Sequence, residues 1–162
     1  MCSKAPSKQF LRSSVSILIG VTFLLCGGAF AHHESESQKI ELLYQDQLVV
    51  DLGETVYQGH CAGCHGWNLE GQANWHKRDE DGYLLAPPHD ETGHTWHHAD
   101  NLLFEMTKYG MQALAGDDYK TRMPVYEGTL SDDDIVAALS YIKSQWPDKV
   151  IQIHNEQINQ QR

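Results

Sequence analysis

The chain has 162 residues, and its 12 Lys and Arg against 22 Asp and Glu give a formal net charge of −10 at pH 7. This length fits one domain, and a hydrophobic content of 41% is enough for a packed core and too high for a disordered chain. The acidic balance argues against a nucleic-acid binder, because such proteins need cationic side chains to displace phosphate counterions. It favours protein partners with basic faces, and added salt should weaken their encounter with the chain.

Residues 1–31 have the pattern of an export signal. Three basic residues and no acidic one precede the uncharged stretch 13–31, which ends in Ala29-Phe30-Ala31, a small-x-small cleavage pattern. We expect cleavage after Ala31, which gives a periplasmic or otherwise exported protein without stable membrane insertion. The alternative is an uncleaved N-terminal anchor, since about 19 uncharged residues are near the lower limit for a bilayer span.

The rest of the chain divides into three parts. Residues 32–49 form a polar leader, although its end, from Ile40 onward, is apolar enough to pack. Residues 50–147 form the main domain, and residues 148–162 form a C-terminal extension that can add a short helix. No internal repeat is present.

The last helix of the main domain has the clearest signals. Ser131-x-x-Asp134 forms a capping-box pattern at its start, and Pro147 cannot extend its hydrogen-bond ladder at its end. Apolar residues recur between them at helical spacing. Shorter helices are predicted at Asp51–Gly59 and Asn101–Tyr109, and the glycine after the second suits a C-terminal cap. No convincing β-hairpin pattern occurs, so the prediction is an all-α protein with long loops.

The segment Cys61-Ala62-Gly63-Cys64-His65 carries the chemistry that the sequence predicts. Cys-x-x-Cys-His is the attachment signature for c-type haem. Two thiols three residues apart on a helical turn can both reach the vinyl groups of one porphyrin edge, and His65 can place its imidazole under the iron. One covalently attached haem c, with its iron, is therefore the expected cofactor.

Other uses of the two cysteines fit less well. Cys61 and Cys64 are the only cysteines after residue 31, so they cannot build a disulfide framework. A structural zinc site would want a second pair of ligands, and no further thiol exists. A thioredoxin-like dithiol lies beside a βαβ unit, of which the sequence shows no sign.

Several weaker features surround this motif in a fixed order: Gly53-x-x-x-Tyr57 before it, then Pro87 or Pro88, then Met123-Pro124, then a capped last helix with Tyr141. In this order the chain resembles the class I, single-haem c-type cytochromes over residues 50–147. The resemblance implies a small cytochrome c-like fold of three to five helices with long loops wrapped around one covalent haem. It also implies a one-electron carrier in an exported electron-transfer chain, with redox proteins as partners. Such a protein is not itself an enzyme, although it can be a subunit of an oxidoreductase complex.

Met123 is the candidate second axial ligand, opposite His65. A thioether is a soft, weak donor, and a His/Met pair raises the reduction potential relative to stronger donors. Pro124 restricts the backbone beside it. Met111 competes for this role from an expected loop, whereas Met106 lies within a predicted helix, where it packs as core.

The resemblance further implies that a proline carbonyl accepts a hydrogen bond from Nδ1 of His65 and fixes the orientation of the ring. Pro87 and Pro88 are both candidates, and a plain loop-stiffening role is equally open.

Three residues are expected at the crossing of the first and last helices: Gly53, Tyr57 and Tyr141. A glycine lets two helices approach closely, and aromatic rings fill the remaining gap. Their expected role is structural.

Residues 67–98 are longer and more polar than a compact member of this family needs, and they are rich in His and Trp. One interpretation is a loop over the haem edge, in which Trp75 or Trp96 donates its indole N–H to a propionate. A second is a copper site at the His-x-x-His-His run that begins at His94. A third is that these are solvated loop histidines, of which one or two make structural hydrogen bonds.

Two other functions stay open. If Met123 is readily displaced, the iron can bind a small gas or peroxide, and the protein is a haem enzyme or a gas sensor. If the histidine run binds copper, the protein is an accessory metal-handling protein.

Overall fold

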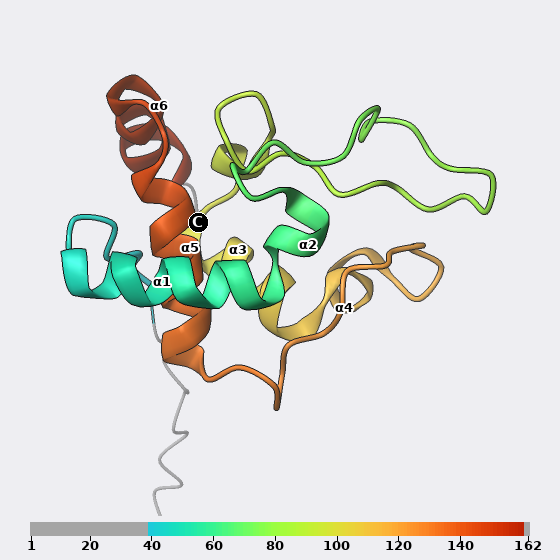
Figure 1. The fold of residues 1–162 in the computed structure, drawn as a ribbon, viewed down its shortest axis with the longest axis horizontal. Coiled ribbons are helices and arrows are strands. Elements are labelled where there is room, and N and C mark those ends of the chain that lie inside the picture. The colour runs from blue at the N-terminus through green and yellow to red at the C-terminus, as the bar shows by residue number, and fades with distance from the viewer. Residues whose placement is uncertain (1–38, 161–162) are drawn as a thin grey trace, which may run out of the picture. The chain divides into compact units, whose positions relative to one another are not determined.

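The computed structural model describes residues 39–160, so the proposed export signal and the start of the leader lie outside the described residues. The helices are α1 (Gln47–His60), α2 (Ala62–His65), α3 (Asp100–Tyr109), α4 (Met111–Ala115), α5 (Asp132–Ser144) and α6 (Asp148–Ile153), with a 3-10 turn η1 (Thr95–His97) and a π-helical turn η2 (His154–Ile158) (Figure 1). Within residues 39–160 no strand forms, and the only bridge is an isolated antiparallel one between Arg78 and Leu84.

The all-α, cytochrome c-like prediction is confirmed. The described part has six α-helices and not three to five, because α2 and α4 are short pieces of four and five residues and α6 lies in the C-terminal extension. Such short pieces escape periodicity analysis, which needs several turns to detect a repeat.

Local capping sets the helix boundaries. The capping box of Ser131 and Asp134 starts α5 as predicted, and α5 ends before Pro147. The first helix begins at Gln47, four residues before its predicted start, because the side chain of Asp46 accepts a hydrogen bond from the backbone N–H of Leu48 (3.0 Å). Helix α3 ends at Tyr109, and the φ of 83° at the next residue, Gly110, suits a glycine cap.

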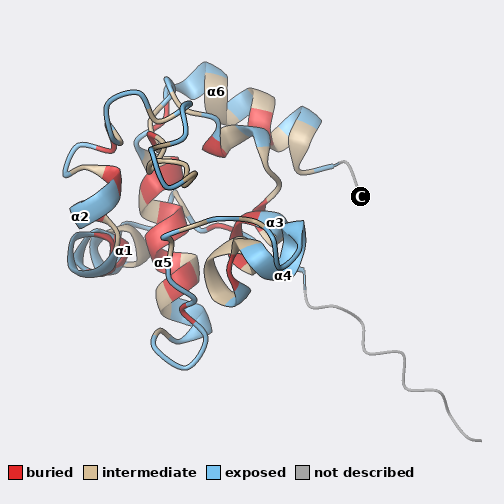
Figure 2. Cartoon of the chain, turned by 90° about the vertical axis from the view of Figure 1, so that its right-hand side faces the viewer, coloured by how far each residue is buried: buried red, intermediate tan, exposed pale blue. Residues whose placement is uncertain are grey.

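The crossing of α1 and α5 is the centre of the packing, and Figure 2 shows that α5 is buried along much of its length. A Cβ on Gly53 would lie 2.0 Å from the carbonyl oxygen of Ala137, so only glycine allows this approach. Tyr57 is fully buried, and its ring centroid lies 5.4 Å from that of Tyr141. The predicted roles of Gly53, Tyr57 and Tyr141 are confirmed.

Both ends of the described chain are tied to Asp100, a buried residue of α3. The backbone N–H of Leu42 donates to its Oδ2 (3.3 Å), and Asn159 Nδ2 donates to the same oxygen (2.7 Å). Lys143 Nζ of α5 lies 3.5 Å from its Oδ1. Residues on both sides of the main domain therefore belong to its folded unit. Loss of either Lys143 or Asp100 would leave the charge of the other buried and uncompensated.

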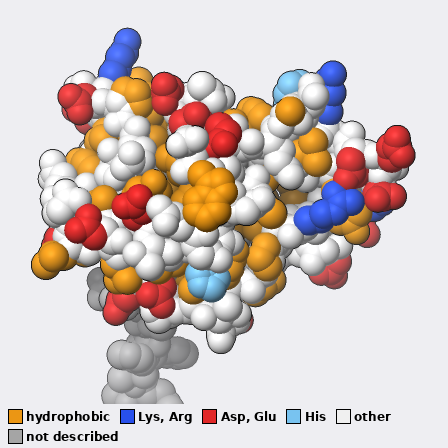
Figure 3. Space-filling view, viewed as in Figure 1, with side chains coloured by type: hydrophobic (Ala, Val, Ile, Leu, Met, Phe, Trp, Pro, Cys, Tyr) orange, Lys and Arg blue, Asp and Glu red, His pale blue; other side chains and the backbone are white. Residues whose placement is uncertain are grey.

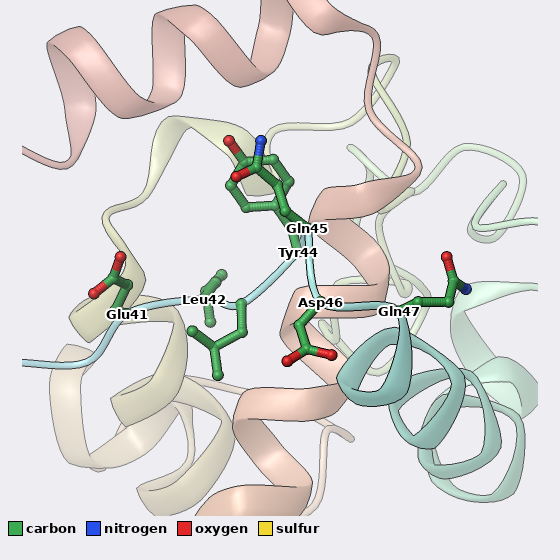
Figure 4. A pocket seen from close by; sticks show the side chains of 7 residues that line it. Glu41, Leu42, Tyr44, Gln45, Asp46 and Gln47 are labelled. Carbon is green, nitrogen blue, oxygen red and sulfur yellow. The ribbon is translucent and has the colours of Figure 1, made fainter.

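The surface of the described residues includes two shallow hollows. One, of about 550 Å³, is lined by Glu41–Gln47, the segment before α1 (Figure 4). The other, of about 320 Å³, is lined by residues that include Trp67, Asp90 and Tyr141. Neither is lined by a candidate haem residue.

Candidate functional site

The Cys-x-x-Cys-His segment lies on one helical turn that continues directly from α1. Cys61 donates its backbone N–H to Tyr57 (2.8 Å), and His65 donates its own to Cys61 (2.9 Å). Residues three apart on such a turn share one face, so both thiols can point the same way. Both cysteines are free, Cys61 half-buried and Cys64 exposed. Burial, with a smaller effect of Cys64, raises the pKa of the Cys61 thiol to about 11, so this side chain is a neutral thiol at pH 7.

The imidazole of His65 is buried and oriented by the backbone of a distant loop. Its Nδ1–H donates to the carbonyl of Pro87 (2.8 Å). Of the two candidate prolines, Pro87 and not Pro88 therefore accepts this hydrogen bond. No hydrogen bond reaches its Nε2 from the described residues. Burial lowers the pKa of His65 although the bond to Pro87 acts in the opposite direction. The ring is thus held as a neutral donor, the form that binds metals.

Close packing keeps the Pro87 carbonyl in place. A Cβ on Gly71 would lie 2.4 Å from the backbone nitrogen of Pro88, and Gly71 also donates its N–H to the carbonyl of His65 (2.7 Å). Gln72 is bonded through both its backbone and its side chain to Ala86 (2.8 Å each). The chain after α2 therefore folds back on the segment that carries Pro87.

His89 lies against His65, a contact that sequence reasoning missed. The two rings stack, with centroids 4.0 Å apart and planes inclined by 20°. Nδ1 of His89 lies 2.7 Å from Oγ1 of the buried Thr95, and Trp146 Nε1 donates to the His89 carbonyl (2.8 Å). Burial lowers the pKa of His89 well below its ordinary value, and the neighbouring His65 adds to this. The only sequence feature that could have indicated this contact was the position of His89, two residues after Pro87.

Met123 is half-buried and packs against the core. Its loop is tied to the cysteine motif, because the hydroxyl of Tyr126 donates to the carbonyl of His60 (2.6 Å), the residue before Cys61. Met106 also packs against the core, from within α3 as expected. The expectation that Met111 lies in a loop is wrong, because it is the first residue of α4.

Trp96 offers an unused hydrogen-bond donor. Its indole Nε1 is buried and has no hydrogen-bond partner in the described part of the chain, although an unpaired buried N–H costs about 1–3 kcal/mol. A bound acceptor such as a carboxylate would remove that cost. Trp75 instead stacks on His94, with ring centroids 5.3 Å apart.

The histidine run from His94 does not group three metal-binding side chains in the described part of the chain. His94 and His98 meet edge to face with ring centroids 5.5 Å apart, and Nε2 of His154 bonds to the carbonyl of His98 (2.9 Å). Among residues 39–160, no three His, Cys, Asp or Glu side chains are grouped so that they could hold a metal ion.

These features define a small α-helical protein with a Cys-x-x-Cys-His turn after its first long helix. The family model described as Cytochrome c matches residues 50–146, and the chain belongs to this family. Its cofactor is covalently bound haem c with iron. Searches of curated proteins and of solved structures find no match. Within the described residues, no helix is both long and apolar enough to cross a bilayer.

The residues present fit this cofactor. Two free thiols lie on one turn. Among residues 39–160, neither the second nitrogen of the neutral His65 imidazole nor the buried indole N–H of Trp96 has a hydrogen-bond partner. A half-buried thioether lies in a loop tied to the same turn.

Proposed function

We propose that Cys61 and Cys64 attach the haem, that His65 and Met123 are its two axial ligands, and that the protein is a one-electron carrier in an exported or periplasmic chain. The observation that carries this proposal is the hydrogen bond from His65 Nδ1 to Pro87. It fixes the tautomer of a motif histidine and leaves Nε2 as the donor atom, as metal-bound histidines require.

The haem supplies reversible one-electron chemistry between ferric and ferrous iron. The chain contributes the atoms that would bind the iron and a rigid surrounding that holds them in place. His65 and Met123 together leave no open position for a substrate, which favours a carrier over an enzyme or gas sensor. The packing of Gly71 and Gln72 around Pro87 resists rotation of the His65 ring.

The acidic surface supports redox partners with basic faces. The net charge of −10 favours encounter with such partners, at a rate that falls as salt screens the field. In the face shown in Figure 3, Asp and Glu side chains are spread over the body of the molecule. Partners of this kind use small, transient interfaces.

The test is a visible spectrum of the exported protein in both oxidation states, with acid-acetone extraction to show that the haem is covalent. A low-spin ferric form with the far-red sulfur-to-iron band supports the carrier. A high-spin ferric form, together with a ferrous form that binds carbon monoxide readily, would instead support an enzyme or sensor. Haem released by the extraction would overturn the assigned attachment.

A further inference from the structure

The long segment 67–98 reaches the loop that carries Met123. We call residues 77–84 the insertion tip and residues 116–126 the methionine loop. Figure 1 shows both on the same side of the molecule, far from each other in sequence. The tip is a closed turn organised by Asp79, whose side chain accepts hydrogen bonds from the backbone N–H groups of Asp81 (3.1 Å) and Tyr83 (2.8 Å).

Two basic residues of the methionine loop contact the insertion tip. Arg122 pairs with the carboxylate of Asp79 and lies 3.4 Å from that of Asp81. Its guanidinium also lies over the ring of Tyr83, 4.1 Å from the centroid. Lys120 Nζ donates to the backbone carbonyl of Asp81 (2.7 Å). The tip thus supplies two carboxylates, a carbonyl and an aromatic face to neighbouring cations.

These contacts fix the backbone on one side of Met123. Arg122 is its immediate neighbour, and the backbone N–H of Met123 donates to Oγ1 of Thr121 (3.0 Å). On the other side, Tyr126 is bonded to His60 (2.6 Å). A loop without regular structure otherwise opens easily. Here it is restrained both before and after the methionine.

We propose that the insertion tip is a clasp that positions Met123 as an axial ligand and resists its displacement. This inference rests on the proposed function of Met123. One exposed ion pair contributes little. In this cluster, however, two carboxylates and an aromatic ring act together on Arg122, the residue beside a weak ligand, and the bond of Lys120 to the Asp81 carbonyl holds the same loop.

The test uses the haem-loaded ferric protein and free imidazole, which competes with the thioether for the iron. Asp79→Asn or Arg122→Gln should raise the apparent affinity for imidazole about three- to tenfold, followed as loss of the far-red sulfur-to-iron band. Arg122→Lys keeps the charge but loses the two-pronged geometry and ring contact, so its effect should be intermediate. High salt should raise the affinity of the wild type and change that of Asp79→Asn less.

Charge exchange gives the sharper version of this experiment. Asp79→Arg and Arg122→Asp should each weaken retention of Met123, and the double variant should recover part of the loss. The matched control is Asp132→Asn, which breaks another exposed ion pair, with Lys108 (2.7 Å), on α5 and away from the insertion tip. That variant should bind imidazole like the wild type.

Failure of the clasp and failure of the proposed function give different results. If the wild type lacks the far-red band, Met123 is not a ligand and both ideas are wrong. If the band is present but the clasp variants and Asp132→Asn all bind imidazole like the wild type, the clasp alone is overturned. The same conclusion follows if Asp132→Asn has as large an effect as Asp79→Asn.

Discussion

The two candidate axial ligands are held in different ways. His65 is 8% exposed and is bonded to a backbone carbonyl within a close-packed loop. The methionine loop is held largely by side chains at the surface, and its main anchor, Arg122, is 52% exposed. Backbone packing is insensitive to salt, whereas exposed charges are screened. The histidine side is therefore the rigid half of the site, and the methionine side is the half that solution conditions can loosen.

The strongest test of the rigid half removes its attachment residues. Cys61→Ala or Cys64→Ala should impair covalent haem attachment and folding together, because the haem supplies much of the core. His65→Ala should lose stable iron ligation. A haem stain after denaturing electrophoresis and an absorption spectrum measure these losses. His60→Ala, at an exposed neighbouring position, is the control and should keep its haem; equal loss there would point to general misfolding.

On the methionine half the expected loss is smaller. Met123→Ala should retain haem, change the spin state and lower the reduction potential, because the iron loses a thioether that favours its ferrous form. Spectroscopy and potentiometry check this. Met111→Ala should leave both unchanged, since that residue begins α4. An unchanged spectrum in Met123→Ala, with a changed one in Met111→Ala, would reverse the assignment.

The close crossing of α1 and α5 can be tested by substituting two glycines of α1. Gly53→Ala should lower the free energy of unfolding by about 1–3 kcal/mol, because its Cβ would overlap the carbonyl of Ala137. Gly59→Ala meets nothing within 4 Å and should be neutral or stabilising by up to about 1 kcal/mol. Chemical denaturation measures both. Similar values for the two variants would contradict the close approach of α1 and α5.

The features that could be predicted from the sequence are local ones. The helical turn of the Cys-x-x-Cys-His segment, the capping box at Ser131 and the stop before Pro147 each depend on residues a few positions apart. The Asp46 cap has the same local character and could have been found by looking for an N-cap before Gln47. The order of motifs then gave the family and the fold.

The features that could not be predicted join residues far apart. The stack of His89 on His65 and the contact of Asp79 with Arg122 depend on how a long loop folds over the domain. No periodicity marks such a loop. The sequence interpretation allowed one or two structural hydrogen bonds among these histidines, but it missed that His89 packs against the candidate ligand His65.

Acidification should act on a buried histidine of the C-terminal extension and leave the methionine side of the site unchanged. His154 is fully buried, near Lys143 of α5 and 3.7 Å from Asp100 of α3. Burial and then Lys143 lower its pKa, whereas its bond to the His98 carbonyl and the charge of Asp100 oppose this. Because its pKa is lower folded than unfolded, the unfolded chain binds more protons below about pH 6.5. Lowering the pH below this value should therefore lower the free energy of unfolding, by at most about 1.4 kcal/mol per pH unit for this residue.

On the methionine side the same change of pH should do little. Arg122 holds the pKa of Asp79 below its ordinary value of 3.8, so their ion pair persists from pH 7 to 5. Denaturation at several pH values should show a shallower slope for His154→Gln than for the wild type, while the far-red band stays unchanged in both. A band lost over this range before the protein unfolds would show that the methionine half, and not the buried histidine, responds to acid. Salt would then no longer be the condition that distinguishes the two sides.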